Sequence, residues 1–174
     1  MGKAVVVVGM DDSDISYHAL EWTLQHLILS ESASAFDNST FKLVIVHARL
    51  NAVNAIGIAG ATPDLVSGVD TYLEETASKV KEKARRICSA YMIHTEEIEV
   101  KEGDPRRVLC EAVEKHNASM LVVGSHGHGA LKRIFLGSVS DYLVHHVKCT
   151  VIIVKQSEKI KRSGSTSSTP KASE

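Results

Sequence analysis

The sequence predicts one α/β domain built on a doubly wound, five-stranded parallel sheet with helices on both faces. Apolar runs rich in β-branched residues recur along the chain. Most of these runs are nearly continuous rather than alternating, which is typical of strands covered on both faces. Segments with helical periodicity separate them, and strands that alternate with helices favour a parallel sheet with right-handed crossovers. The length of 174 residues suits a single domain with a sizeable core.

Five segments are expected to form the strands of this sheet. The third segment carries charge and alternates in polarity, so we expect it at a partly exposed edge. Ligands of such sheets bind beyond the carboxyl ends of the strands, so functional residues are expected to follow strand ends. The five segments are residues 4–10, 41–48, 96–102, 118–124 and 150–154.

Helical signals lie between the strands. Residues 20–28 and 73–91 place apolar side chains at the spacing of one buried helix face. Asp104 and Pro105 mark the start of another helix, as N-cap and first helical residue. A last helix is expected over residues 138–146.

Two segments fall outside this pattern. Residues 50–69 are rich in alanine and glycine, and they are expected to form a long loop that is either a lid, a mobile insertion or a plain surface excursion. Residues 156–174 are polar and rich in serine and threonine, which indicates a flexible tail. The predicted organisation is therefore one domain over residues 1–155 and a tail over residues 156–174.

Composition narrows the classes of function. The formal net charge of −1 gives no broad basic field, so no nucleic-acid partner is expected. No apolar stretch is long enough to span a bilayer, and no membrane partner is expected. The N-terminus lacks the layout of a signal peptide. The cysteines, Cys88, Cys110 and Cys149, form no C-x-x-C pair and are expected as reduced thiols in a cytoplasmic protein.

The stretch GSHGHGALKRIFLGS, residues 124–138, carries the clearest chemical signal. It follows a predicted buried strand and leads into a predicted helix. Successive N–H groups in a glycine-rich turn form an anion site, and a helix N-terminus adds its dipole and free donors. Gly127 and Gly137 are expected to let the backbone approach a ligand and to have positive φ angles. Lys132 and Arg133 could add positive charge close to phosphate oxygens. The pattern indicates phosphate binding.

Rival interpretations of this stretch have less support. The P-loop pattern is absent, and the dinucleotide fingerprint does not follow the first strand. His126 and His128 form an H-x-H pair that could bind a metal, but no third ligand with sensible spacing is evident. The glycines and histidines could also merely fill a loop.

These residues resemble the universal stress protein family. Gly124, Gly127, Gly137 and Ser138 occupy every fixed position of that family's nucleotide-binding pattern. The segments VVVVGMDDS and GDPRRVLCEAV also resemble the family, although Met10 replaces its usual valine. The resemblance covers about residues 3–155 and points to a plant member.

The resemblance implies the strand order 3-2-1-4-5 of the adenine nucleotide alpha hydrolase-like fold. It also implies a stress-response protein that binds ATP or AMP, with Mg²⁺ an optional companion of ATP, and that forms a homodimer. The apolar segment 150–154 would then lie at a sheet edge, so we expect it to form the dimer contact. A nucleotide-dependent sensor or regulator is the favoured function. The alternatives are a slow ATP hydrolase and a redox or flavin module. The chain lacks the C-x-x-C pair expected of a redox module and the aromatic residues expected around a flavin.

The site follows position by position from the resemblance, with no catalytic residue and no metal ligand assigned. Asp11 would bond the adenosine moiety, although it could instead cap a helix, a role that Asp12 or Ser13 could equally fill. Ala48 would meet adenine through its backbone. Val123 and Gly124 would lie beside the ribose. The residues expected around the phosphates are His126, Gly127, Gly137, Ser138, Val139 and Ser140.

Overall fold

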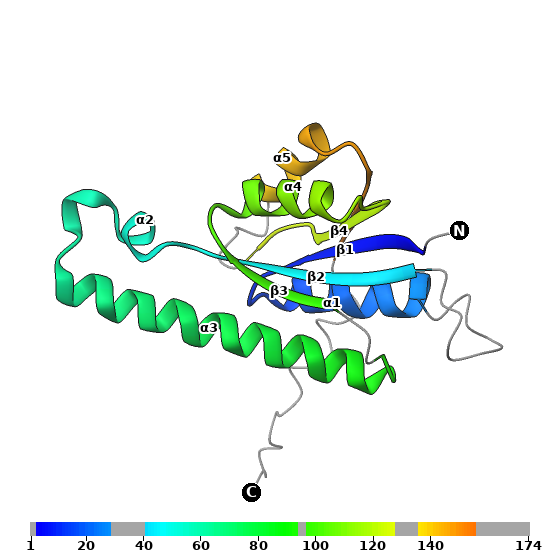
Figure 1. Ribbon diagram of the computed structural model, residues 1–174, viewed down its shortest axis with the longest axis horizontal. Helices are drawn as coiled ribbons and strands as arrows, with labels where there is room; N and C mark the ends of the chain where they lie inside the picture. Colours follow the sequence, from blue (N-terminus) through cyan, green and yellow to red (C-terminus); the bar gives the residue numbers. More distant parts are fainter. Residues whose placement is uncertain (1–2, 29–40, 94–96, 128–135, 156–174) are drawn as a thin grey trace, which may run out of the picture.

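The computed structural model describes residues 3–28, 41–93, 97–127 and 136–155. These residues form one five-stranded sheet of order β3-β2-β1-β4-β5, in which every neighbouring pair is parallel. Helices α4 and α5 lie on one side of the sheet, and α1 and α3 lie on the other (Figure 1). The predicted fold class and strand order are confirmed. The strands are β1 (Ala4–Met10), β2 (Phe41–Arg49), β3 (Glu97–Glu102), β4 (Met120–Gly124) and β5 (Thr150–Val154).

The helices alternate with the strands along the chain. α1 continues into a π-helical turn at Leu24–Ile28, and a short 3₁₀ turn at Ile58–Gly60 lies between α2 and α3. No helix among the described residues is both long and apolar enough to cross a membrane. The helices are α1 (Asp14–Thr23), α2 (Ala52–Ile56), α3 (Pro63–Ala90), α4 (Pro105–Lys115) and α5 (Ser138–His146).

The core consists of two layers, one on each face of the sheet. On the central strand β1, Val6 and Val8 face α1 and α3, whereas Val7 faces α4 and α5. All three side chains are fully buried. A strand packed on both faces needs apolar residues at successive positions, which explains the nearly continuous apolar runs in the sequence.

The segment over residues 50–69 is not the long loop that its composition suggested. α2 and the 3₁₀ turn occupy its first part, and α3 begins at Pro63. The side-chain oxygen of Thr62 accepts a hydrogen bond from the Leu65 N–H, so Thr62 and Pro63 together start the helix. This part of the chain projects past the ends of the strands (Figure 1).

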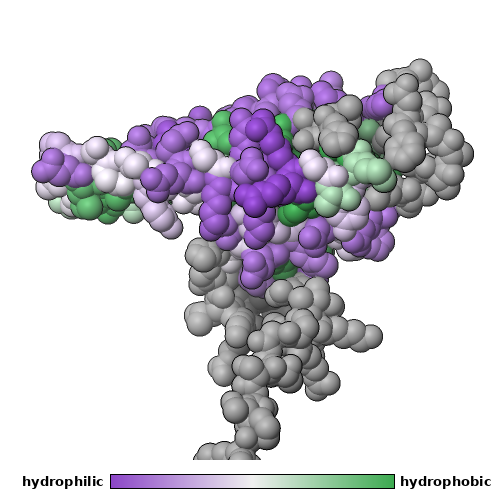
Figure 2. Space-filling view, turned by 90° about the horizontal axis from the view of Figure 1, so that it is seen from below, coloured by the Kyte–Doolittle hydropathy of each residue, from purple (hydrophilic) through white to green (hydrophobic). Residues whose placement is uncertain are grey.

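The apolar pattern missed the start of α3 because its first turns have little to pack against. Leu65 is 46% exposed and Tyr72 is 65% exposed. Figure 2 shows hydrophobic surface near the tip of this projection, and Ile58, in the 3₁₀ turn, is 87% exposed. Val66 and Val69 stand at helical spacing but are only partly buried, so the first turns of α3 have no fully buried stripe.

Strand β3 lies at an edge of the sheet, as predicted, and an ion-pair cluster joins it to α4. Glu99 Oε1 lies 2.5 Å from Lys115 Nζ and 2.7 Å from His116 Nε2. The Glu99 side chain is only 12% exposed. Burial alone would raise the pKa of Glu99, but the hydrogen bonds from Lys115 and His116 lower this pKa to about 2.

The Glu99 cluster makes a pH-dependent contribution to stability. Because its folded-state pKa is depressed, the contribution is full above about pH 4.5 and is lost as the pH falls toward 2. We expect Glu99→Gln to lower the free energy of unfolding by about 1–3 kcal/mol at pH 7. Urea titrations between pH 7 and 3 should show this difference shrinking with acidity. Glu111→Gln, which breaks an exposed pair with Arg107, is the control. A pH-independent difference would contradict the assignment.

Candidate functional site

A cavity of about 610 Å³ opens at the carboxyl ends of β1, β2 and β4. The chain runs from β1 outward through β2 and β3, and then returns to place β4 on the other side of β1. The cavity therefore lies where strand order reverses, which is where open α/β sheets bind ligands. The residues that line it are Gly9, Met10, Asp11, Ser16, Val46, Ala48, Leu50, Pro105, Leu109, Val123, Gly124, His126, Gly127, Gly137, Ser138, Val139 and Ser140.

All ten candidate residues from the sequence lie along this one cavity. They come from the ends of three strands, from the segment after β4 and from the first turn of α5. Sequence reasoning missed seven further lining residues, most of which are apolar or glycine and carry no chemical signature. The convergence of strand ends could have indicated Leu50 and Pro105, because Leu50 follows β2 and Pro105 begins the helix after β3.

The N-terminus of α5 faces the cavity without a side-chain cap. Gly137 is its N-cap and has no side chain with which to bond the first N–H groups. The other four α-helices in the described part of the chain are capped by side chains, those of Ser13, Asn51, Thr62 and Asp104. The α5 terminus therefore offers backbone donors and the positive end of the helix dipole to a ligand.

Hydrogen bonds fix the backbone on both sides of this terminus. The Gly137 N–H donates to the Ser125 carbonyl at 2.7 Å, and the Ser125 N–H donates to the Val154 carbonyl at 2.8 Å. The Ser140 hydroxyl lies 3.1 Å from the Ser125 carbonyl and 3.0 Å from the Gly137 carbonyl. Ser140 is buried, so this candidate residue ties the first turn of α5 to Ser125 as well as lining the cavity.

Gly127 and Gly137 are glycines because other atoms of the protein lie close to them, and not because their backbone requires a positive φ. The expectation of positive φ at these positions is wrong, since Gly137 has φ −74° and Gly127 is not among the described glycines with positive φ. A Cβ on Gly127 would lie 2.5 Å from Asp11 Oδ2, and one on Gly137 would lie 3.1 Å from His126 Cα. A side chain at Gly127 would have to displace the Asp11 carboxylate, and one at Gly137 would crowd the backbone of His126.

Asp11 lines the cavity and does not cap α1. Ser13 is the cap, with its Oγ accepting from the Ser16 N–H at 3.3 Å. Asp11 Oδ1 accepts hydrogen bonds from the Ser13 N–H, at 3.2 Å, and from the Ser13 hydroxyl. These bonds hold the carboxylate at the exit of β1, where it can accept from hydroxyl groups of a ligand.

The neighbouring Asp12 is occupied elsewhere. Its carboxylate accepts from the Tyr17 hydroxyl at 2.7 Å and from Lys79 Nζ at 2.7 Å. Burial alone would raise the pKa of Asp12, but the hydrogen bonds from Lys79 and Tyr17 lower it below its usual value. Asp12 therefore ties α1 to α3 and does not line the cavity.

Some predictions cannot be placed or lie away from the cavity. His128, Lys132 and Arg133 lie outside the described residues, so their proposed roles stay predictions. Among the described residues, one group of three potential metal ligands lies close together, and it belongs to the Glu99 cluster. The Glu97 carboxylate pairs with Lys42, and the Glu99 carboxylate pairs with Lys115. The group consists of Glu97, Glu99 and His116.

The strand order and the position of the cavity define the class: an α/β protein with the adenine nucleotide alpha hydrolase-like fold. A model of the universal stress protein family matches residues 4–155. The chain therefore belongs to the universal stress protein family, as its motifs indicated.

Known members of the family resemble this chain along most of its length. The Universal stress protein A-like protein of Arabidopsis thaliana is 29% identical over 144 residues, covering 79% of this chain and 77% of the relative. The structure of an Arabidopsis thaliana universal stress protein family protein with AMP bound has a TM-score of 0.64. It is 25% identical and covers 92% of this chain and 97% of that one.

A second solved structure, a universal stress protein in complex with cAMP, shares the fold. Its TM-score is 0.58 at 24% identity, with 88% of this chain and 98% of that chain covered.

Proposed function

We propose that the cavity binds an adenine mononucleotide, AMP or ATP, with its phosphates at the N-terminus of α5. The α5 terminus is the observation that carries this proposal, because it faces the cavity and its N-cap residue, Gly137, has no side chain to bond the first N–H groups. Gly127 and Gly137 line the cavity beside this terminus. The AMP and cAMP bound in the similar structures support this choice of ligand class.

The remaining candidate residues take the rest of the nucleotide in this proposal. Asp11 accepts hydrogen bonds from the adenosine moiety, and Val123 and Gly124 lie beside the ribose. Ala48, at the end of β2, meets the base through its backbone. The position of these residues along one cavity supports the arrangement.

The bound nucleotide serves as a signal in this proposal, and the protein acts as a sensor or regulator. Asp11 and His126 are the titratable groups among the described lining residues, which include no lysine or arginine. Rapid phosphoryl transfer needs positive charge at the transferred group and a positioned water. This chemistry favours binding over catalysis, and slow ATP hydrolysis is the second candidate.

Any ATP hydrolysis by the purified protein is expected to be far slower than the turnover of about 1–100 per second that is typical of kinases. The reason is the absence of basic side chains among the described lining residues. Release of phosphate should be followed in a sample free of contaminating ATPases. Turnover within that range, lost in Asp11→Ala, would overturn the sensor proposal and place the chemistry at the exit of β1.

The proposal also covers the domain organisation, the oligomeric state and the cellular compartment of the protein. Residues 1–155 act as one nucleotide-binding domain, and the protein works as a homodimer joined through β5. Cys88, Cys110 and Cys149 are free thiols, which supports a reducing compartment such as the cytoplasm.

The nucleotide that accompanies the purified protein tests the ligand assignment. Freshly purified protein should be denatured, and the released small molecules identified by mass spectrometry. We expect AMP or ATP in the wild-type sample and a much smaller amount in Gly127→Val. Recovery of a different ligand class in comparable amount to the protein would contradict the proposal.

A further inference from the structure

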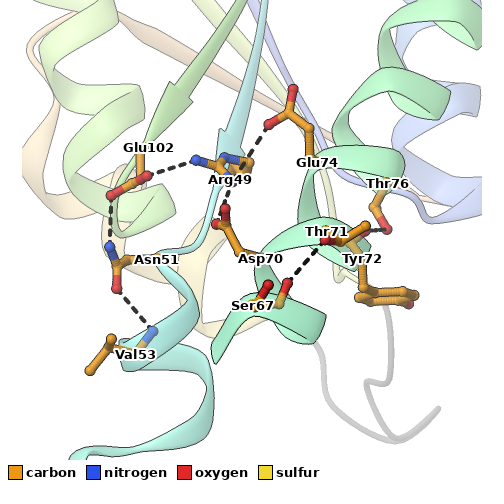
Figure 3. Close-up of polar contacts among 10 residues, drawn as sticks. All are labelled: Arg49, Asn51, Val53, Ser67, Asp70, Thr71, Tyr72, Glu74, Thr76 and Glu102. Carbon is orange, nitrogen blue, oxygen red and sulfur yellow. Dashed lines mark hydrogen bonds and ion pairs between the residues drawn. The ribbon is translucent and has the colours of Figure 1, made fainter. Parts of the chain in front are cut away.

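The Glu102 carboxylate bonds the side chains of both neighbours of Leu50, a residue at the rim of the cavity. Leu50 follows β2 directly and lines the cavity. Its neighbour Arg49 donates from Nη2 to Glu102 Oε2 at 2.8 Å, and its other neighbour, Asn51, donates from Nδ2 to Glu102 Oε1 at 2.8 Å (Figure 3). The Gly103 N–H also donates to the Arg49 carbonyl at 2.9 Å. The end of β3 therefore fixes the backbone of Leu50.

Arg49 extends this arrangement to α3. Its Nη1 lies 2.8 Å from Asp70 Oδ1 and 3.5 Å from Glu74 Oε2 (Figure 3). The Arg49 side chain is only 16% exposed, so its guanidinium is held in one geometry by three carboxylates. Asn51 in turn accepts from the Val53 N–H at 3.0 Å and caps α2. Two strands and two helices meet at this cluster.

Leu50 is unusual among the exposed apolar side chains. It is 41% exposed, and of the large exposed hydrophobic residues in the described segments it is the one that lines the cavity. Ala48, the candidate contact to the base, lies two residues before it on the same rim. An apolar side chain on a fixed backbone offers a ready surface for the flat apolar face of a purine ring.

We propose that Arg49 and Glu102 are positioning residues that hold Leu50 as a wall of the base end of the cavity. This inference rests on the proposed nucleotide function and deepens it. Neither residue lines the cavity, so both act through Leu50. The fixed wall contributes to binding because the free protein already has the shape that the base requires.

Three ligands separate this role from a general structural one. AMP, adenosine and ribose 5-phosphate should be titrated into the wild type, Arg49→Met, Glu102→Gln and Leu50→Ala. We expect each substitution to weaken AMP and adenosine by the same factor, about five- to tenfold, and to leave ribose 5-phosphate unchanged. Arg86→Met, which breaks an exposed ion pair with Glu82 on α3, should bind all three like the wild type.

Combined substitutions sharpen the test. If Arg49 acts through Leu50, then Arg49→Met together with Leu50→Ala should lose no more affinity for AMP than Leu50→Ala alone. Arg49→Lys, which keeps the charge, should recover part of the affinity that Arg49→Met loses. Circular dichroism and the melting temperature confirm that each variant is folded.

The outcomes separate the two claims. Unchanged affinity for AMP and adenosine in folded Arg49→Met, or equal losses for all three ligands, would overturn the positioning role and leave the proposed function in place. If the wild type binds none of the three ligands, the proposed function falls and the positioning role falls with it.

Discussion

Replacing Gly127 with valine is expected to abolish adenine nucleotide binding in a protein that still folds. A Cβ at this position would lie 2.5 Å from Asp11 Oδ2, so any larger side chain must displace the Asp11 carboxylate. The same side chain would intrude on the approach of phosphate to the backbone. The affinity for AMP should fall by at least about a hundredfold, which corresponds to about 3 kcal/mol.

The control for this prediction is a glycine without neighbours. A Cβ on Gly68 of α3 would meet nothing within 4 Å, so Gly68→Ala should bind AMP like the wild type. Calorimetric titration gives the affinities, and circular dichroism shows that the sheet is retained. A folded Gly127→Val protein with wild-type affinity would mean that the segment after β4 does not hold the phosphates.

Replacing Ile152 with lysine is expected to convert the proposed β5-joined homodimer into a monomer. The two edges of the sheet differ, since β3 carries charged residues that discourage pairing, whereas β5 has the sequence TVIIV. Val151, Ile152 and Ile153 are only half-buried in the single chain. An apolar edge strand of this kind is an aggregation hazard unless a partner covers it, and a second copy related by a two-fold axis would do so.

Sedimentation velocity measures this change directly. Ile152 packs against the core on the α1 side, so Ile152→Val serves as the control that preserves the apolar contact and should remain a dimer. Circular dichroism must show that the lysine variant is folded. A wild-type protein that is monomeric at about 50 µM would contradict dimer formation through β5.

The sequence predicted the elements whose burial leaves a pattern. β1, β5 and α5 have the expected bounds, because both strands are continuous apolar runs in the sequence and Ser138 begins a helix directly after a glycine cap. The start of α3 was missed because its first turns are exposed. The Thr62–Pro63 capping signal and the apolar residues Val66 and Val69 were present in the sequence, but the alanine- and glycine-rich composition of residues 50–69 indicated a loop.

The sequence likewise located some residues of the candidate site and not others. Its glycines and serines lie in a spaced motif, so they could be located before the structure. The support for Leu50 could not, because Arg49 pairs with Asp70, 21 positions away, and with Glu102, 53 positions away. Long-range ion pairs of this kind depend on the register of β2 with β3, where Arg49 lies opposite Glu102.

Calorimetric titration of the wild-type protein with AMP, after removal of any bound nucleotide, tests the central claim most directly. The uncapped α5 terminus and the surrounding cavity predict saturable binding of one AMP per chain, with adenosine binding more weakly because it lacks the phosphate. Folded protein that gives no binding signal with AMP or ATP, or that binds adenosine as tightly as AMP, would contradict the assignment of the α5 terminus as the phosphate site.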